Sequence, residues 1–400
     1  MEYILQPTTP IDKKRILLRV DFNVPIKNGK IEDPARIEAA IPTITYLLKK
    51  DCEIILISHL GNPKGQFDPS LSLKPIAEFL SQKLHMPIKF YPHDSSKPLS
   101  SLKIDPHQKI SLLDNLRFQA AEEEPSKDLS FAKSLASLAD IYIDDAFACA
   151  HRPHSSIVTV VDYFKNKAYL GLLMAKELSA LNNLIHQPKK PYLAILGGAK
   201  VSSKIKVIES LLNKVDALMI GGGMSVPFLK AQKKHFFSPL ADLEAVEFAK
   251  KIMTQADKKK IPIFLPEDLV ASKSLTSAES LRIVKIDQGS FQDEIPVDIG
   301  PITISTFCEK ISNYQTIFWN GPMGVFEVPP FDQGTALIAD AIAHHQSFSV
   351  IGGGDSAYAA EKLGFKNKFS HVSTGGGASI EFLEKGTLPG IEAVKLAHQA

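Results

Sequence analysis

Short apolar runs alternate with amphipathic stretches along almost the whole chain of 400 residues. In the first half, apolar runs predict strands at residues 15–20, 53–58, 89–91, 110–113 and 141–143. Helical periodicity between and after them predicts helices at residues 35–48, 74–84, 126–138 and 167–185. Strands alternating with helices in this way are typical of parallel sheets that helices cover on both faces.

The long helical pattern ends at Pro188 and Pro191, which flank two lysines and mark a boundary. Beyond it, further strands are predicted at residues 193–196, 217–220, 263–265, 283–286, 316–319, 348–351 and 371–372. A chain of 400 residues exceeds one ordinary core. The sequence therefore predicts an α/β protein with domains at 1–170 and 188–387, joined by a helix at 171–187.

Composition narrows the class of protein. With 44% hydrophobic and 22% charged residues, the chain resembles ordinary globular proteins. Its net charge of +2 gives no bulk attraction to nucleic acid or membrane surfaces, and no apolar run approaches the ~20 residues of a membrane span. Cys52, Cys149 and Cys308 are scattered, which argues for a reducing compartment, and the N-terminus shows no secretory signal. We therefore expect a cytoplasmic protein with no nucleic-acid or membrane partner.

Four glycine clusters each follow an apolar run, at residues 197–198, 221–223, 352–354 and 375–377. Glycine lets backbone N–H groups approach a ligand closely, and a helix N-terminus offers free donors to an anion. One such turn is equally consistent with tight packing. Four of them in one half predict a phosphate-rich ligand that several turns hold together.

Ligands of open α/β sheets bind beyond the carboxyl ends of the strands. In the first half, the polar residues at these positions are Asp21, Asn23, Arg36, His59, Arg117 and Arg152. Guanidinium groups suit carboxylate and phosphate, so this half predicts a pocket for a small polyanion. Taken singly, Arg36 or Arg117 also fits a surface ion pair, and His59 a structural loop residue.

In the second half, the corresponding residues are Lys200, Lys204, Asn320, Glu327 and Asp355. A lysine is a mobile point charge that can follow a phosphoryl group, and an aspartate beside a glycine turn suits Mg²⁺. Lys200 and Lys204 also fit a solvated helix face. The two halves together favour phosphoryl transfer between two substrates, which needs positioning and charge neutralisation more than covalent chemistry.

Two further patterns bear on these hypotheses. No G-x-x-x-x-G-K-[ST] and no G-x-G-x-x-G occurs, and the second absence weakens the alternative of a dinucleotide-dependent dehydrogenase. The acidic run Glu122, Glu123 and Glu124 is interpreted as the solvated start of the helix at 126–138, where it suits the helix dipole.

Nine segments resemble, in order, the signatures of the phosphoglycerate kinase family, among them Arg19-Val20-Asp21-Phe22-Asn23-Val24-Pro25 and Trp319-Asn320-Gly321-Pro322-Met323-Gly324. The full set lies at residues 19–25, 58–61, 115–118, 150–156, 196–201, 221–224, 319–327, 352–355 and 373–379. The resemblance implies two Rossmann-like lobes, each a parallel β-sheet covered by helices, with the tail 388–400 returning to the first lobe. It also implies a monomeric, hinge-bending glycolytic kinase. Such an enzyme transfers a phosphoryl group in line between ATP and the carboxylate of 3-phosphoglycerate, giving ADP and 1,3-bisphosphoglycerate.

The resemblance also implies residue roles. It implies that 3-phosphoglycerate is bound by Asp21, Phe22, Asn23, Arg36, His59, Leu60, Gly61, Asn62, Arg117 and Arg152. It implies that Mg²⁺ is bound at Asp355. It implies that the nucleotide is bound by Gly198, Lys200, Lys204, Gly222, Gly223, Pro296, Asn320, Glu327, Gly352, Gly353, Gly354, Asp355 and Ser356. Its catalytic residues are Arg36, Lys200 and Gly376. The attacking carboxylate has a reference pKa near ~4 and needs no general base.

The chain departs from the family pattern at two positions. Asn62 replaces the arginine of the usual S-H-L-G-R-P, and an unreplaced charge-assisted hydrogen bond is worth roughly 1.5–3 kcal/mol. Pro296 replaces a small residue of the adenine segment and removes a backbone N–H. A second alternative is a catalytically silent binding protein with this fold, but the presence of Arg36, Lys200 and Asp355 argues against it.

Overall fold

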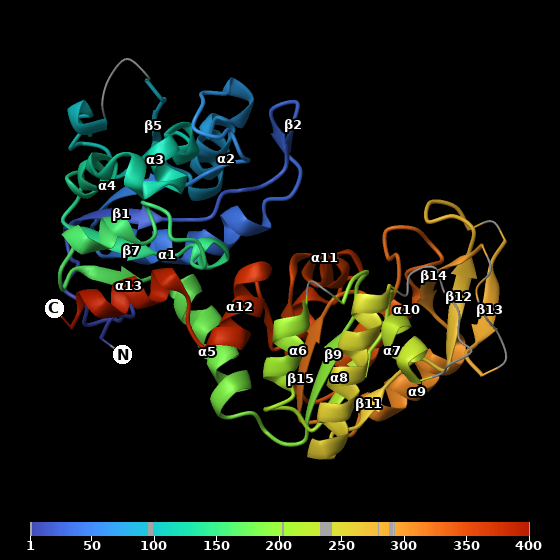
Figure 1. Cartoon of the computed structure of the whole chain (residues 1–400). Coiled ribbons are helices and arrows are strands. Elements are labelled where there is room, and N and C mark those ends of the chain that lie inside the picture. The colour runs from blue at the N-terminus through green and yellow to red at the C-terminus, as the bar shows by residue number, and fades with distance from the viewer. Residues whose placement is uncertain are drawn as a thin grey trace. The chain divides into compact units, whose positions relative to one another are not determined.

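A computed structural model describes residues 2–94, 99–201, 204–232, 242–278, 280–287, 291 and 293–399. The chain divides into two compact units (Figure 1). Unit 1 comprises Met1–Ser179 and Thr387–Ala400, and unit 2 comprises Ala180–Gly386. The division falls inside helix α5 (Leu172–His186). Among the described residues, none of the helices combines the length and apolarity that crossing a bilayer requires.

Unit 1 is built on a six-stranded parallel sheet in the order β5-β6-β4-β1-β7-β8. Its strands are β1 (Arg15–Arg19), β4 (Glu53–Ile57), β5 (Lys89–Tyr91), β6 (Ile110–Leu113), β7 (Ile141–Asp144) and β8 (Ala168–Leu170). Strands β2 (Ile26–Lys27) and β3 (Lys30–Ile31) form a separate antiparallel pair. The central strands are buried almost throughout, as expected where both faces of a parallel sheet are covered.

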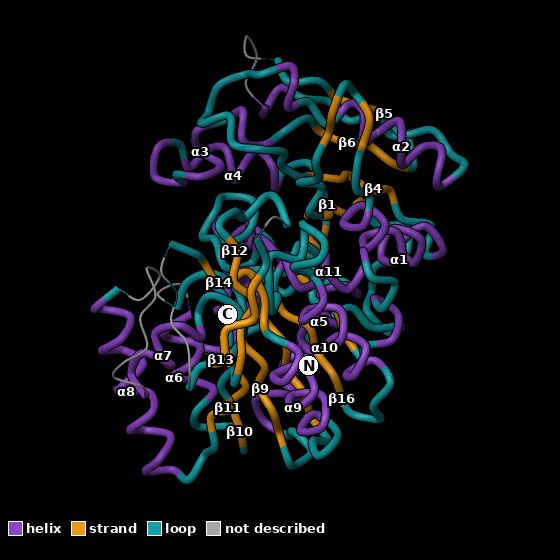
Figure 2. The backbone as a smooth tube through the Cα atoms, turned by 90° about the vertical axis from the view of Figure 1, so that its right-hand side faces the viewer, coloured by secondary structure: helices purple, strands orange, loops and turns teal. Residues whose placement is uncertain are grey.

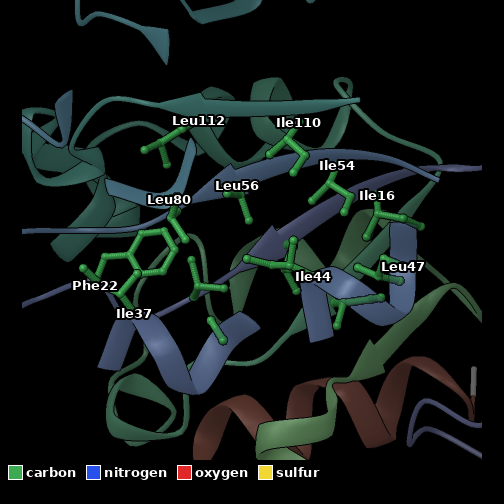
Figure 3. Close-up of a cluster of buried hydrophobic side chains, with 14 of the residues drawn as sticks. Ile16, Phe22, Ile37, Ile44, Leu47, Ile54, Leu56, Leu80, Ile110 and Leu112 are labelled. Carbon is green, nitrogen blue, oxygen red and sulfur yellow. The ribbon is translucent and has the colours of Figure 1, made fainter. Parts of the chain in front are cut away.

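Helices α1 (Ala35–Lys49) and α2 (Lys74–Leu84) pack their apolar sides against this sheet (Figure 3). Ile44 and Leu47 of α1 pack against Ile16 and Ile54, which point to the same face because they are register partners on the neighbouring strands β1 and β4. The other helices of unit 1 include α3 (Ala120–Glu123), α4 (Leu129–Ala136) and α13 (Pro389–Ala397). The chain's last helix is held by backbone bonds, since Gly390 N–H donates to Ala150 O (2.9 Å) and Asn166 N–H donates to Ala397 O (2.9 Å).

Unit 2 contains a second six-stranded parallel sheet, in the order β11-β10-β9-β15-β16-β17. Its strands are β9 (Tyr192–Leu196), β10 (Ala217–Ile220), β11 (Ile263–Phe264), β15 (Thr316–Asn320), β16 (Phe348–Gly352) and β17 (His371–Val372). One side carries α6 (Ile205–Leu211), α7 (Ser225–Gln232) and α8 (Leu243–Lys259), and the other carries α9 (Pro301–Ile311), α10 (Gln333–Ala343) and α11 (Gly354–Lys362) (Figure 2). Helix α12 (Gly377–Lys385) packs against α6. The predicted fold class is confirmed.

Two sequence predictions of local structure were wrong. The segment 283–286 does not join the parallel series: β13 (Arg282–Lys285) is an outer strand of an antiparallel sheet with β12 (Asp268–Ser272) and β14 (Ile295–Ile299). Only Val284 of β13 is buried, as suits an outer strand. Residues 168–170 form β8 rather than helix, and α5 begins only at Leu172.

Candidate active site

The polar residues predicted for the first half lie at the carboxyl edge of the unit 1 sheet. We call the set Asp21, Asn23, Arg36, His59, Arg117 and Arg152 the arginine site. Asp21 and Asn23 follow β1, while Arg36 lies in the first turn of α1. Arg36 Nη1 lies 3.0 Å from Asp21 Oδ2 and donates to Asn23 O at 3.0 Å. The start of α1 and the end of β1 are therefore fixed to each other.

Hydrogen bonds also join the loops after β1, β4 and β6. Gly61 N–H donates to Asn23 Oδ1 (2.9 Å), and Arg117 Nη1 donates to Gly61 O (2.7 Å). Leu60 O accepts from Asn115 Nδ2 (2.7 Å), which belongs to the same loop as Arg117. The structure therefore brings these predicted residues together.

The remaining predicted residues of unit 1 differ in exposure. Phe22 is buried, and its N–H donates to Ser58 Oγ (2.9 Å). Asn62 and Arg152 are exposed. Arg152 lies on the loop after β7, where Nε lies 3.4 Å from His151 Nε2.

The charge of the arginine site favours an anion. Arg117 is buried, and its Nη2 has no hydrogen-bond partner among the described residues. A buried guanidinium N–H without an acceptor destabilises the free protein, and a bound anion removes that penalty. Ligand atoms of Asp21, His59 and Cys149 lie within 4.8 Å of one another, but the surrounding arginines oppose a metal cation there.

The acidic run was interpreted wrongly. Only Glu124 is exposed; Glu122 is completely buried, and Glu123 Oε1 lies 3.1 Å from Arg117 Nε. The reason is that Ser156 donates two hydrogen bonds to the Glu122 carboxylate, and the charge of Arg19 lies close enough to favour its ionised form. Arg19 could have indicated this from the sequence, because a charged residue in an apolar strand requires a buried partner of opposite charge.

In unit 2, a cavity of about 710 Å³ lies among the strand-end turns and the antiparallel sheet. Of the predicted nucleotide residues it is lined by Gly198, Lys200, Gly222, Gly223, Pro296, Glu327 and Asp355. Leu269, Ile295, Val297 and Phe326 add an apolar wall. Apolar walls with a few polar groups are typical of small-molecule sites.

A second cavity of about 510 Å³ lies beside the N-termini of α11 and α12. It is lined by the predicted residues Lys204, Asn320, Gly353, Gly354, Asp355, Ser356 and Gly376. Asp355 lines both cavities. We call the two cavities together the glycine site. Free N–H groups at the two helix starts suit phosphate oxygens.

Several glycine-site residues hold the turns together. Lys204 Nζ donates to Gly197 O (2.6 Å) and Asn320 O (3.0 Å), and burial lowers its pKa to about 8, although the Asp355 charge opposes this shift. Asn320 Nδ2 donates to Gly352 O (2.6 Å). Gly353 has φ +97°, and a Cβ there would lie 2.6 Å from Asn320 Nδ2, so this turn requires glycine.

Comparison with known proteins identifies the family. A family model described as phosphoglycerate kinase matches residues 8–386. The chain belongs to the phosphoglycerate kinase family. It is 47% identical to the phosphoglycerate kinase of Chlamydia abortus over 388 residues, which cover 96% of each chain. It is 45% identical to that of Finegoldia magna over 390 residues, covering 96% of this chain and 97% of the relative.

Solved phosphoglycerate kinase structures agree over the whole fold. The enzyme from Coxiella burnetii has a TM-score of 0.88 at 36% identity and covers 98% of this chain and 99% of its own. The enzyme from Pyrococcus horikoshii has a TM-score of 0.81 at 29% identity, with 97% of both chains covered. The family consists of glycolytic, ATP-dependent phosphotransferases that act on the carboxyl group of 3-phosphoglycerate. The activity expected from the sequence is confirmed, and the dehydrogenase alternative is set aside.

Proposed function

We propose that 3-phosphoglycerate binds at the arginine site and that ATP or ADP binds at the glycine site. The observation that carries the first assignment is the buried Nη2 donor of Arg117, which lies among further cationic side chains and has no hydrogen-bond partner in the part of the chain that the structure describes. The cavity with one apolar wall and a glycine-lined edge supports the second. A small dianion and a nucleotide thus have separate sites of matching chemistry.

At the arginine site, Arg117 and Arg152 supply guanidinium groups for the substrate phosphate, and His59 adds a ring donor. Arg36 lies beside Asp21 at the start of α1 and faces the reacting carboxylate. Backbone and side chains of Phe22, Asn23, Leu60, Gly61 and Asn62 complete the walls. Arginine is suited to this work because its planar fork binds carboxylate and phosphate through two hydrogen bonds.

At the glycine site, the base occupies the larger cavity beside Pro296, and Glu327 accepts from the ribose hydroxyls. The phosphates continue past Asp355 towards the starts of α11 and α12, since Asp355 lines both cavities. Lys200 and Lys204 provide positive charge along this path. An exposed carboxylate beside the phosphate path fits Mg²⁺, which would add charge neutralisation to the phosphates when bound.

In the reaction, a carboxylate oxygen of 3-phosphoglycerate forms a bond to the γ-phosphorus while the bond from that phosphorus to the β,γ-bridging oxygen breaks. ADP leaves with that oxygen, and no proton is transferred. Lys200 and the backbone N–H of Gly376 stabilise the charge on the transferring group, as pre-organised donors do in phosphoryl transfer. In-line transfer requires the two substrates to meet, so closure of the units belongs to the proposal.

A coupled assay with 3-phosphoglycerate, ATP and Mg²⁺ tests the assignment. Arg117→Gln should raise KM for 3-phosphoglycerate at least tenfold and leave nucleotide binding unchanged. Arg15→Gln is the matched control, because Arg15 begins β1 at the opposite edge of the same sheet. Absence of turnover by folded wild-type protein would overturn the proposal. We further propose a monomer in the cytoplasm, which gel filtration with light scattering and cell fractionation test.

A further inference from the structure

Glu122 is a completely buried carboxylate behind the arginine site. Its Oε1 accepts from Ser156 Oγ (2.7 Å), and its Oε2 accepts from Ser156 N–H (3.0 Å). Burial raises the pKa of Glu122, while the charge of Arg19 and the bonds from Ser156 oppose that rise. The carboxylate of Glu122 therefore interacts with neighbouring protein groups and not with solvent.

Arg19 is the next member of this chain of contacts. It is the last residue of β1 and is 1% exposed. Its Nε donates to Ser156 Oγ (2.8 Å), its Nη1 donates to Val20 O, and its Nη2 lies 3.3 Å from His59 Nδ1. The guanidinium group of Arg19 is thereby held by three contacts, and one of them is with His59 of the arginine site.

The contact between Arg19 and His59 decides the tautomer of the imidazole. A guanidinium group has donors only, so Nδ1 of His59 must accept and its proton lies on Nε2. Burial, followed by the charges of Arg19, Arg117, Arg152 and His154, lowers the pKa of His59 well below its usual range. Cys149 Sγ also faces Nδ1, at 3.9 Å. The ring is therefore neutral and has a single N–H donor.

We propose that Glu122 is a positioning residue for the kinase reaction. Through Ser156 it fixes Arg19, and Arg19 fixes His59 in the tautomer whose Nε2–H donates to the bound 3-phosphoglycerate. Glu123 acts in parallel on Arg117 Nε, at 3.1 Å, so that the end of one short helix orients two side chains of the site, His59 and Arg117. This inference rests on the proposed binding of 3-phosphoglycerate at the arginine site.

A positioning role and a purely electrostatic role predict opposite signs. Glu122 is a negative charge behind a site for an anion, so removing the charge alone should strengthen anion binding. Removing an anchor of the contact chain should weaken it. Glu122→Gln separates the two, because glutamine keeps the shape but has one acceptor for the two donors of Ser156.

The test compares Glu122→Gln and Arg19→Lys with Glu124→Gln. Arg19→Lys keeps the charge but loses the fork, and Glu124 is the exposed neighbour of Glu122. We expect KM for 3-phosphoglycerate to rise at least tenfold in the first two variants, with kcat changed less than threefold and KM for ATP unchanged. Glu124→Gln should behave as wild type.

Nitrogen-15 NMR of histidine-labelled protein reads the tautomer independently of activity. Wild-type His59, assigned by its loss in His59→Gln, should show only the neutral Nε2–H form between pH 6 and 8. Glu122→Gln and Arg19→Lys should show mixed tautomers. If either fails to fold, judged by circular dichroism, Ser156→Ala replaces it, since this variant removes the same link at its middle.

Two results would overturn the inference. One is an unchanged or lower KM for 3-phosphoglycerate in Glu122→Gln. The other is a raised KM with an unchanged His59 tautomer, which would show a structural role only. Failure of the proposed function looks different: wild-type protein would not turn over 3-phosphoglycerate, while the NMR spectra would still report whether Glu122 and Arg19 fix the ring.

Discussion

Asp145, a buried carboxyl group at the start of α5, offers a sharp test of the electrostatics of unit 1. Its Oδ1 accepts from Leu173 N–H (2.9 Å) and Met174 N–H (3.1 Å), so it caps the first turn of α5. Its Oδ2 is buried and has no hydrogen-bond partner among the described residues. Asp145→Asn keeps the acceptor for both N–H groups and removes the group that ionises.

The expected difference in unfolding free energy follows from the pKa of Asp145. Burial raises the pKa of Asp145 to about 7, with a further rise from Asp144, whereas an unfolded aspartate titrates near ~4. A raised pKa means that the stabilising contribution is present below pH ~4 and is lost as pH rises through 7. A shift of roughly three units corresponds to about 4 kcal/mol. Between pH 4 and 8, Asp145→Asn should gain up to about 4 kcal/mol of unfolding free energy relative to wild type.

The assay must follow unit 1. The chain has one tryptophan, Trp319, which lies in unit 2, so its fluorescence does not report on this site. Hydrogen exchange of peptides from β7 and α5, corrected for the intrinsic rate at each pH, gives the local opening free energy. Asp51→Asn is the control of opposite sign, since a hydrogen bond from Lys109 lowers the pKa of this exposed carboxyl group. A difference between Asp145→Asn and wild type that is independent of pH would refute the reasoning.

Three further predictions concern catalysis. Lys200→Ala should lower kcat roughly 100- to 1,000-fold with little change in nucleotide affinity, as loss of a transition-state contact does, and a loss confined to KM would contradict this. Asn62→Arg should lower KM for 3-phosphoglycerate about fivefold, less than a buried pair would give because the position is exposed; an unchanged KM in steady-state kinetics argues against it. Asp355→Asn should raise the Mg²⁺ concentration needed for half-maximal rate, and a metal titration identical to wild type would remove Asp355 from the metal site.

Most of the fold could be predicted because its strands are buried on both faces. Runs such as those of β9 and β10 are continuously apolar and therefore visible in the sequence. Strands β12 and β14 were missed because Asp268 begins the first and Asp298 lies within the second. Both aspartates are buried and accept backbone N–H groups, Asp268 from Thr303 and Asp298 from Gly334. A polar residue with a distant partner looks like a loop residue until the partner is known.

The residues of the site also differ in whether the sequence could predict them. The glycine turns and the arginines after the strands were accessible from position alone, because strand ends converge at one edge. Glu122 was not, since it is adjacent to Glu123 and only two positions before the exposed Glu124. Whether an acidic side chain faces solvent or a buried arginine depends on where the short helix α3 points. That direction is set by contacts with Ser155 and Ser156, more than thirty residues later.

The same polar groups that make the site also weaken the free protein. Arg117 Nη2 and Asn320 Oδ1 are buried without hydrogen-bond partners among the described residues, and Lys204 is charged only against the penalty of burial. Each buried group without a partner destabilises the unliganded state by about 1–3 kcal/mol. Under the proposed assignment, an anion at Arg117 supplies the missing acceptor and a phosphate near Lys204 offsets the burial of its charge, so both contribute to the binding free energy. The proposed assignment therefore gives the unpaired donor of Arg117 a part in binding, since a guanidinium group with internal partners for every N–H would gain less from an anion.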